Sequence, residues 1–223
     1  MLTFLGASLF NIAAGEPFTP AQVLWIHFFV NAAFGLALGF DLETPGLMRT
    51  HPRPRGQSLL TPRLIATVGL TGLLITVGLL LLLSLGTEQF GSLDVARSVA
   101  FTSFSLSLIV GALEVRSETQ TVFTTATFDS KQMNWTVLAE FVLTVLVTQM
   151  DVFNRILDTV PISLSEFGWA LVPALTLLIL WEVGKAVVRW ADSRHGRSAG
   201  SRPTRPGGEA PSGQAIPTPR GRS

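Results

Sequence analysis

Long apolar runs alternate with short polar segments along this chain. Five runs approach the ~20 residues that a helix needs to cross a bilayer, and they lie at about 21–40, 64–85, 95–113, 135–150 and 167–188. A sixth run, Leu2–Ala14, is too short to span alone, so it is either a helix without its beginning or an interfacial or re-entrant segment. The pattern predicts an all-α, polytopic membrane helix bundle of about six transmembrane segments, the first one truncated.

Composition supports this class of protein. Only 14% of the 223 residues are charged, against about a quarter in a soluble domain, and the mean hydropathy is +0.45. Cysteine is absent, which excludes disulfides and thiolate metal sites. From residue 191 onward the chain is rich in Arg, Gly, Pro and Ser without apolar periodicity. We therefore expect a membrane domain at 1–190 and a disordered cytoplasmic tail at 191–223.

The basic residues predict an orientation. Fourteen of the sixteen Lys and Arg residues fall in three regions, which are 40–63, 114–134 and the end of the chain from Lys185. The opposite side of the predicted bundle holds only Arg97 and Arg155. Because cytoplasmic segments carry the excess of Lys and Arg in membrane proteins, we expect both termini in the cytoplasm.

Two polar side chains interrupt the run at 21–40. His27 and Asn31 are four residues apart, so a helix places them on one face, and Gly35 and Gly39 continue that stripe. A polar pair at mid-membrane depth is costly, which makes it a candidate functional site.

The stretch around this pair resembles the P-type cation-transporting ATPases. Its residues read FTPAQVLWI, then the polar helix ending in LALGF, then an acidic loop with PGLM followed by RPR. This order is similar to the sixth transmembrane helix of the calcium-pump-like superfamily and the loop after it. The resemblance covers about residues 1–190. It implies the C-terminal membrane domain of a bacterial pump, helices five to ten, beginning partway through helix five.

The resemblance also indicates where a cation would bind. In calcium-pump relatives the sixth helix reads Trp-x-Asn-x-x-x-Asp-Gly-Leu-Pro-Ala. Here that register places His27 at the Asn, Asn31 at the Asp and Phe34 at the Pro. Calcium prefers about six to eight oxygen ligands, whereas this helix offers one amide oxygen and an imidazole, which favours transition metals or proton transfer. His27 and Asn31 are the candidate cation-binding residues, with the metal unknown; the alternative role is interhelical hydrogen bonding.

Three further polar residues are secondary candidates. Ser103 and Ser107 lie one helical turn apart in the run at 95–113, on a face that contributes ligands in the family, although such serines often bond their own helix carbonyls. Glu140 shares a face with two threonines in the run at 135–150, where it could join a proton path or have a structural role.

Two charged segments read as structural. The segment Glu114-Val-Arg116-Ser117-Glu118 resembles an Arg-Ser-Glu segment of the family and is expected to pack the cytoplasmic loops together. The last span is expected to close in an interface anchor of aromatic and basic residues, made by Glu182, Lys185, Arg189 and Trp190.

The catalytic parts of a P-type ATPase have no counterpart in this sequence. The family uses a phosphorylated aspartate in Asp-Lys-Thr-Gly, a nucleotide domain and a magnesium-binding hinge motif, and the nearest run, Asp129-Ser130-Lys131, does not match. We therefore expect no catalytic residue, no cofactor and no ATPase activity in this chain alone. ATP and Mg would bind the missing domains.

Three functions fit these observations. The first is an ion-translocation domain, present as a fragment or separate subunit, that needs the N-terminal half of a P-type ATPase. The second is a non-catalytic membrane scaffold or regulator derived from such a pump. The third is a small autonomous transporter or channel, which inverted repeats would favour, but no convincing repeat is present. The expected partners are the lipid bilayer and a transported cation, not nucleic acid, and the expected location is the plasma membrane of a bacterium.

Overall fold

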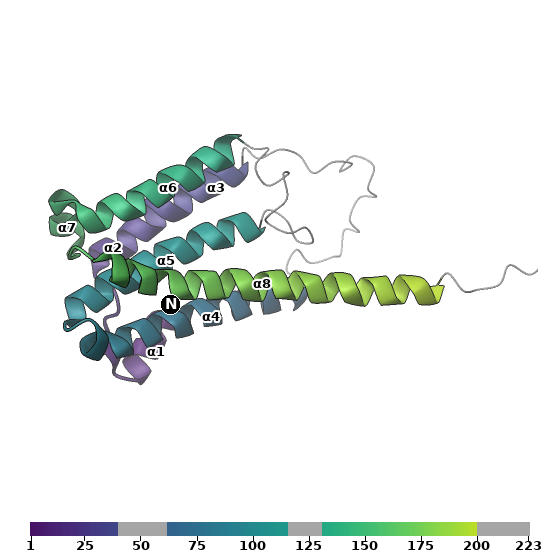
Figure 1. The fold of residues 1–223 in the computed structure, drawn as a ribbon, viewed down its shortest axis with the longest axis horizontal. Helices are drawn as coiled ribbons and strands as arrows, with labels where there is room; N and C mark the ends of the chain where they lie inside the picture. The colour runs from purple at the N-terminus through teal and green to yellow at the C-terminus, as the bar shows by residue number, and fades with distance from the viewer. Residues whose placement is uncertain (40–61, 116–130, 200–223) are drawn as a thin grey trace, which may run out of the picture.

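The computed structural model describes residues 1–39, 62–115 and 131–199, and every regular element within these ranges is a helix. The elements are α1 (Leu2–Leu9), η1 (Ile12–Gly15), α2 (Pro20–Trp25), η2 (Ile26–Asn31), α3 (Ala32–Gly39), α4 (Pro62–Gln89), α5 (Leu93–Val115), α6 (Lys131–Gln149), α7 (Asp151–Leu157) and α8 (Leu164–Ala199). The predicted all-α bundle is confirmed (Figure 1).

Four helical stretches are long and apolar enough to cross a membrane, namely Pro20–Gly39, Leu64–Gly86, Leu93–Glu114 and Leu164–Val187. The first combines α2, η2 and α3 into one continuous span. Helices α6 and α7 pass the same test only together, and because they are bent by 85° at a short break they form either a fifth, broken span or a re-entrant loop. The chain is therefore an integral membrane protein. Four of the five long runs that hydropathy predicts are spans by themselves, and the run at 135–150 passes only together with α7.

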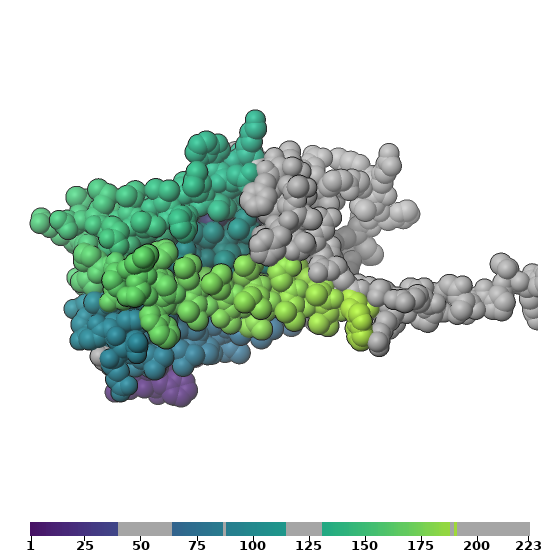
Figure 2. All heavy atoms as spheres, viewed as in Figure 1, coloured from purple at the N-terminus to yellow at the C-terminus, as the bar shows by residue number. Residues whose placement is uncertain are grey.

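Helix α5 is the centre of the bundle. Of its membrane-spanning stretch 67% is buried, against 22–28% for the three other spans. It packs against α4, α6 and α8, and α6 and α8 cover most of it on the face shown in Figure 2. The other spans have a broad apolar face that this chain does not cover. Such a face is typical of contact with lipid or with another protein.

The first segment is a short helix that does not span. Helix α1 has only eight residues and packs against α4. The hydroxyls of Thr3 and Thr76 form a hydrogen bond of 3.4 Å between the two helices. The chain then turns through η1 with left-handed backbone at Asn11, Ala13 and Ala14. This confirms that the first run is too short to cross alone.

Two predicted boundaries differ from the structure. The predicted run at 135–150 is followed directly by a second helix, α7, because Val152, Phe153 and Ile156 give residues 151–157 a helical apolar pattern. Helix α8 continues to Ala199, past residue 191, where the tail was expected to begin. The rest of the predicted tail and the loops at 40–61 and 116–130 lie outside the described residues.

The helix ends also fit a two-sided arrangement. The C-terminal ends of α3 and α5 and the N-terminal ends of α4 and α6 lie at the same end of the bundle (Figure 1). The opposite end holds α7 and the start of α2, which are in contact. The helix ends that flank residues 40–61 and 116–130 therefore lie at the same end of the bundle.

Candidate functional site

The span that carries the polar pair starts at a well-defined N-terminus. Thr19 caps α2 by accepting a hydrogen bond from the Gln22 backbone at 3.3 Å, and the Gln22 side chain accepts one from the Thr19 backbone at 3.1 Å. Pro20 occupies the first helical position, where its missing N–H costs nothing. This reciprocal capping satisfies two of the free N–H groups at the helix start.

The same two residues tie the span to α7. The Thr19 hydroxyl donates to the Leu157 carbonyl at 3.3 Å, and the Gln22 amide donates to the Asp158 carbonyl at 3.5 Å. Gln22 is completely buried. A buried amide held on both sides fixes the depth at which the following turns of helix sit in the bundle.

His27 and Asn31 lie in the π-helical turn η2. The Asn31 Nδ2 and the His27 Nδ1 lie 3.3 Å apart, within hydrogen-bond distance. The prediction that the two share one face is confirmed. The wider turn was not predicted; π-helical turns occur inside α-helices mostly as isolated features, frequently at functional sites.

The polar pair faces away from the bundle. Ile26, Val30 and Phe34 form the buried side of this span, whereas His27 and Asn31 are exposed. Gly35 and Gly39 continue the exposed stripe, and a Cβ at either would meet no atom within 4 Å. Helices that pack closely in membranes use small residues at the contact, so the stripe has room for a further helix.

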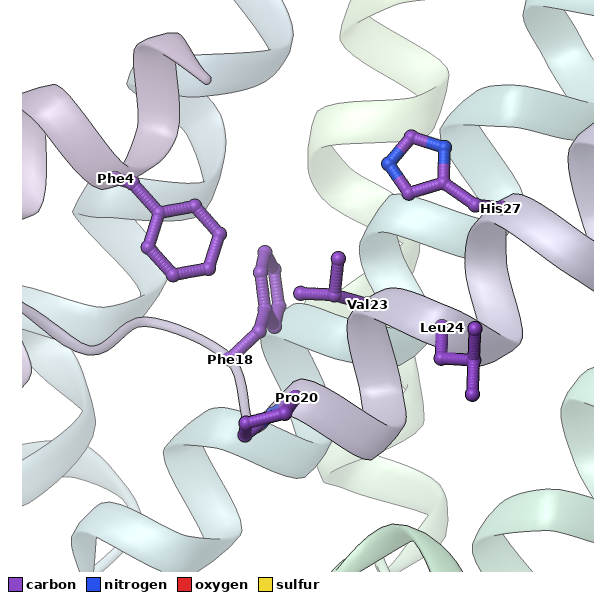
Figure 3. A pocket seen from close by; sticks show the side chains of 6 residues that line it. All are labelled: Phe4, Phe18, Pro20, Val23, Leu24 and His27. Atoms are coloured by element: carbon purple, nitrogen blue, oxygen red, sulfur yellow. The ribbon is translucent and has the colours of Figure 1, made fainter.

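A hollow borders His27 on the side of α1. It has a volume of about 390 Å³ and is lined by Phe4, Phe18, Pro20, Val23, Leu24 and His27. Figure 3 shows Phe4 and Phe18 on one side of the gap and His27 on the other. Five of the six lining side chains are apolar, so the imidazole is the one group of this set that can bind a polar ligand.

The secondary candidates are buried, unlike the exposed His27–Asn31 pair. Ser103 and Ser107 are buried in α5, where the Ser107 hydroxyl donates to the Ser103 carbonyl at 2.8 Å. Among the described residues the Ser103 hydroxyl has no hydrogen-bond partner. Glu140 is buried in α6, and the hydroxyl of Thr144 donates to its backbone carbonyl at 2.8 Å. The threonine therefore does not bind the carboxylate, and Glu140 stays a candidate by its burial alone.

No complete metal site is present in the described part of the chain. It contains no group of three or more His, Cys, Asp or Glu side chains arranged to hold a metal ion. His27 and Asn31 supply at most two ligands from one helix. Any cation held there needs further ligands from outside these residues.

One ion pair in the structure was not predicted from the sequence. The Lys185 Nζ of α8 lies 2.6 Å from the Glu114 Oε2 of α5, and 2% and 0% of the two side chains are exposed. Glu182 lies 3.9 Å from the same ammonium. Lys185 was expected in an interface anchor at the end of the last span, but its side chain is buried against α5 instead of being exposed. The available signal was a pair of opposite charges at the same predicted end of two apolar runs.

These features define a polytopic membrane domain with a polar pair in one span, and comparison with known proteins gives its family. The family described as "Cation transporting ATPase, C-terminus" matches residues 15–187. The chain belongs to this family. The resemblance found around the polar pair is thereby confirmed over most of the chain.

Full-length relatives are similar over the same region. The chain is 27% identical over 184 residues to a "Probable cation-transporting ATPase F" of Mycobacterium tuberculosis. The aligned region makes up 79% of this chain and 20% of the relative. It is 25% identical over 184 residues to a "Calcium-transporting ATPase 1" of Bacillus cereus, covering 76% of this chain and 21% of the relative. The chain thus spans about a fifth of the length of these relatives.

Proposed function

We propose that this chain is the ion-translocation domain of a P-type cation-transporting ATPase, acting with the phosphorylation and nucleotide-binding domains of such a pump. The observation that carries the proposal is the His27–Asn31 pair, hydrogen-bonded at 3.3 Å in a π-helical turn and exposed in the middle of a span. An uncovered polar pair is costly in lipid. A further helix of the pump that covers the pair would remove this cost.

The pair would act as part of a shared cation site. Asn31 can offer its Oδ1 and His27 a ring nitrogen, while the remaining ligands come from helices outside this chain. One amide and one imidazole favour a transition metal or a proton over calcium. The names of the calcium-transporting relatives therefore do not decide the ion for this chain.

The rest of the proposal follows from the family and the charge pattern. ATP and Mg²⁺ would bind the partner domains, and this chain would contribute no catalytic residue. The distribution of Lys and Arg supports cytoplasmic termini, and the bacterial relatives support the plasma membrane of a bacterium.

A chimeric pump tests this function. The C-terminal membrane segment of the Bacillus cereus relative is replaced by this chain, and ATP hydrolysis in proteoliposomes is measured with Ca²⁺, Mn²⁺ and Zn²⁺ and across a pH series. We expect cation- or proton-stimulated hydrolysis that falls on the order of tenfold or more in His27→Ala and Asn31→Ala, as loss of a ligand predicts. Ser84→Ala is the control, because this exposed hydroxyl donates to its own helix at 3.0 Å.

Two results would count against the proposal. A chimera that assembles but shows no ion-stimulated hydrolysis would argue against translocation by this chain. Unchanged hydrolysis in both site variants would remove the His27–Asn31 pair from the site.

A second function is a scaffold or regulator that binds a pump without transporting. The absence of a three-ligand metal group in the described residues supports this alternative. It predicts that the chain co-purifies with the N-terminal half of a relative while that complex stays inactive with every ion and at every pH.

A further inference from the structure

We propose that Glu114 and Lys185 form a buried charge clasp that fixes the register of α8 against α5. The contact joins the last turn of α5 to α8, and both side chains are almost fully covered. The proposal goes beyond transport, because it concerns how this chain holds its own helices in place.

The position of Glu114 is the first argument. Its carboxylate lies in the last turn of α5, where the helix carbonyls carry negative partial charge, so an acidic residue is unfavourable there. It is also 0% exposed, so water cannot solvate the charge. A buried charge of this kind persists only when it is paired, and the ammonium at 2.6 Å supplies the pairing.

The route of α8 is the second argument. Farther back along this helix, Pro173 packs against Gly78 of α4 so closely that a Cβ at the glycine would lie 2.8 Å from the proline Cβ. Lys185 follows twelve residues later, about 18 Å along the axis. Helix α8 is therefore held at two depths, by an apolar contact with α4 and by a charge pair with α5.

The two contacts differ in how strongly they specify a register. Apolar helix faces in lipid slide past one another at little cost, because lipid is as apolar as leucine. A buried ion pair favours one alignment, because a shift of α8 moves Lys185 away from the buried Glu114 carboxylate. Such pairs add little net stability compared with apolar side chains but can define a unique arrangement.

Thermal unfolding of the full chain in detergent tests the pairing. We expect Lys185→Met to lower the Tm by about 10 °C, because it leaves a buried carboxylate unpaired at a helix C-terminus. Glu114→Gln should lower the Tm less, because Lys185 keeps Glu182 at 3.9 Å. Replacing both (Glu114→Leu with Lys185→Met) should restore the Tm to within a few degrees. Lys131→Met, at an exposed lysine of α6, is the matched control and should change nothing.

The register itself needs a second measurement. Because the chain has no cysteine, spin labels can be attached at Asp94→Cys on α5 and Val183→Cys on α8, both exposed positions. We expect one narrow distance distribution with the pair intact and a clearly broader one in the doubly apolar variant, even where its Tm is restored.

Each outcome decides the proposal. It is overturned if Lys185→Met behaves like Lys131→Met, if the double variant loses as much as the two single changes added together, or if its distance distribution stays as narrow as that of the parent. If Lys185→Met does not fold at all, a folded double variant with a broad distribution supports the clasp, and an unfolded one overturns it.

Discussion

The His27–Asn31 pair and the Glu114–Lys185 pair are both polar contacts within apolar spans, and they differ in which way they face. The first is exposed on a span that is 28% buried. The second lies between α5 and α8 with almost no exposed surface. Polar and charged side chains are costly in lipid, so the buried pair matches its charges within the chain while the exposed pair requires something outside it.

This difference separates two tasks in one domain. The charge pair and most of α5 are buried within this chain. The polar stripe with Gly35 and Gly39 remains open for a neighbour, in a chain that spans about a fifth of its relatives. Variants on the buried side should therefore affect the chain itself, and variants on the stripe should affect only an assembly.

The largest expected effect on stability comes from an aspartate introduced on the buried face of the span, compared with the same residue on its exposed face. Val30 is 1% exposed and Asn31 is its exposed neighbour. Val30→Asp should destabilise the detergent-solubilised chain by about 3 kcal/mol or more, because it buries an unpaired carboxyl group. Asn31→Asp should cost clearly less, because this position is not enclosed by the bundle. Unfolding by SDS titration measures both; equal effects would mean that the two faces are not distinct.

The sequence predicts the His27–Asn31 pair but not the Glu114–Lys185 pair. Hydropathy locates the spans, because a bilayer demands long apolar runs, and a spacing of four residues suffices to bring His27 next to Asn31. The π-helical turn leaves no periodic signal in so short a stretch. Lys185 reads as a surface anchor because it follows an apolar run, and only contact with α5, some seventy residues earlier, buries it. Local spacing is readable from a single sequence, whereas burial between distant helices is not.

Replacing a glycine by alanine should have an intermediate effect on stability, and the effect should again differ between the buried and the exposed side of the bundle. A Cβ on Gly86 would lie 2.1 Å from the Ala96 Cβ, so α4 and α5 would have to separate, and Gly86→Ala should cost about 1–3 kcal/mol. Gly35→Ala meets no atom within 4 Å and should stabilise the isolated chain slightly, since alanine is the better helix former. SDS titration again gives the values. A destabilised Gly35→Ala chain would show that this face is already covered.

The smallest effect is expected for removal of the polar pair from the chain alone. His27→Ala breaks a hydrogen bond between two exposed side chains, so the free energy of unfolding should change by no more than about 0.5 kcal/mol. The same substitution should weaken ion-stimulated hydrolysis in the chimeric pump, where the stripe is covered. SDS titration beside Ser84→Ala measures the first value. A loss as large as that of Gly86→Ala would show that the pair stabilises the bundle itself, and the contrast between an internal clasp and an external site would then disappear.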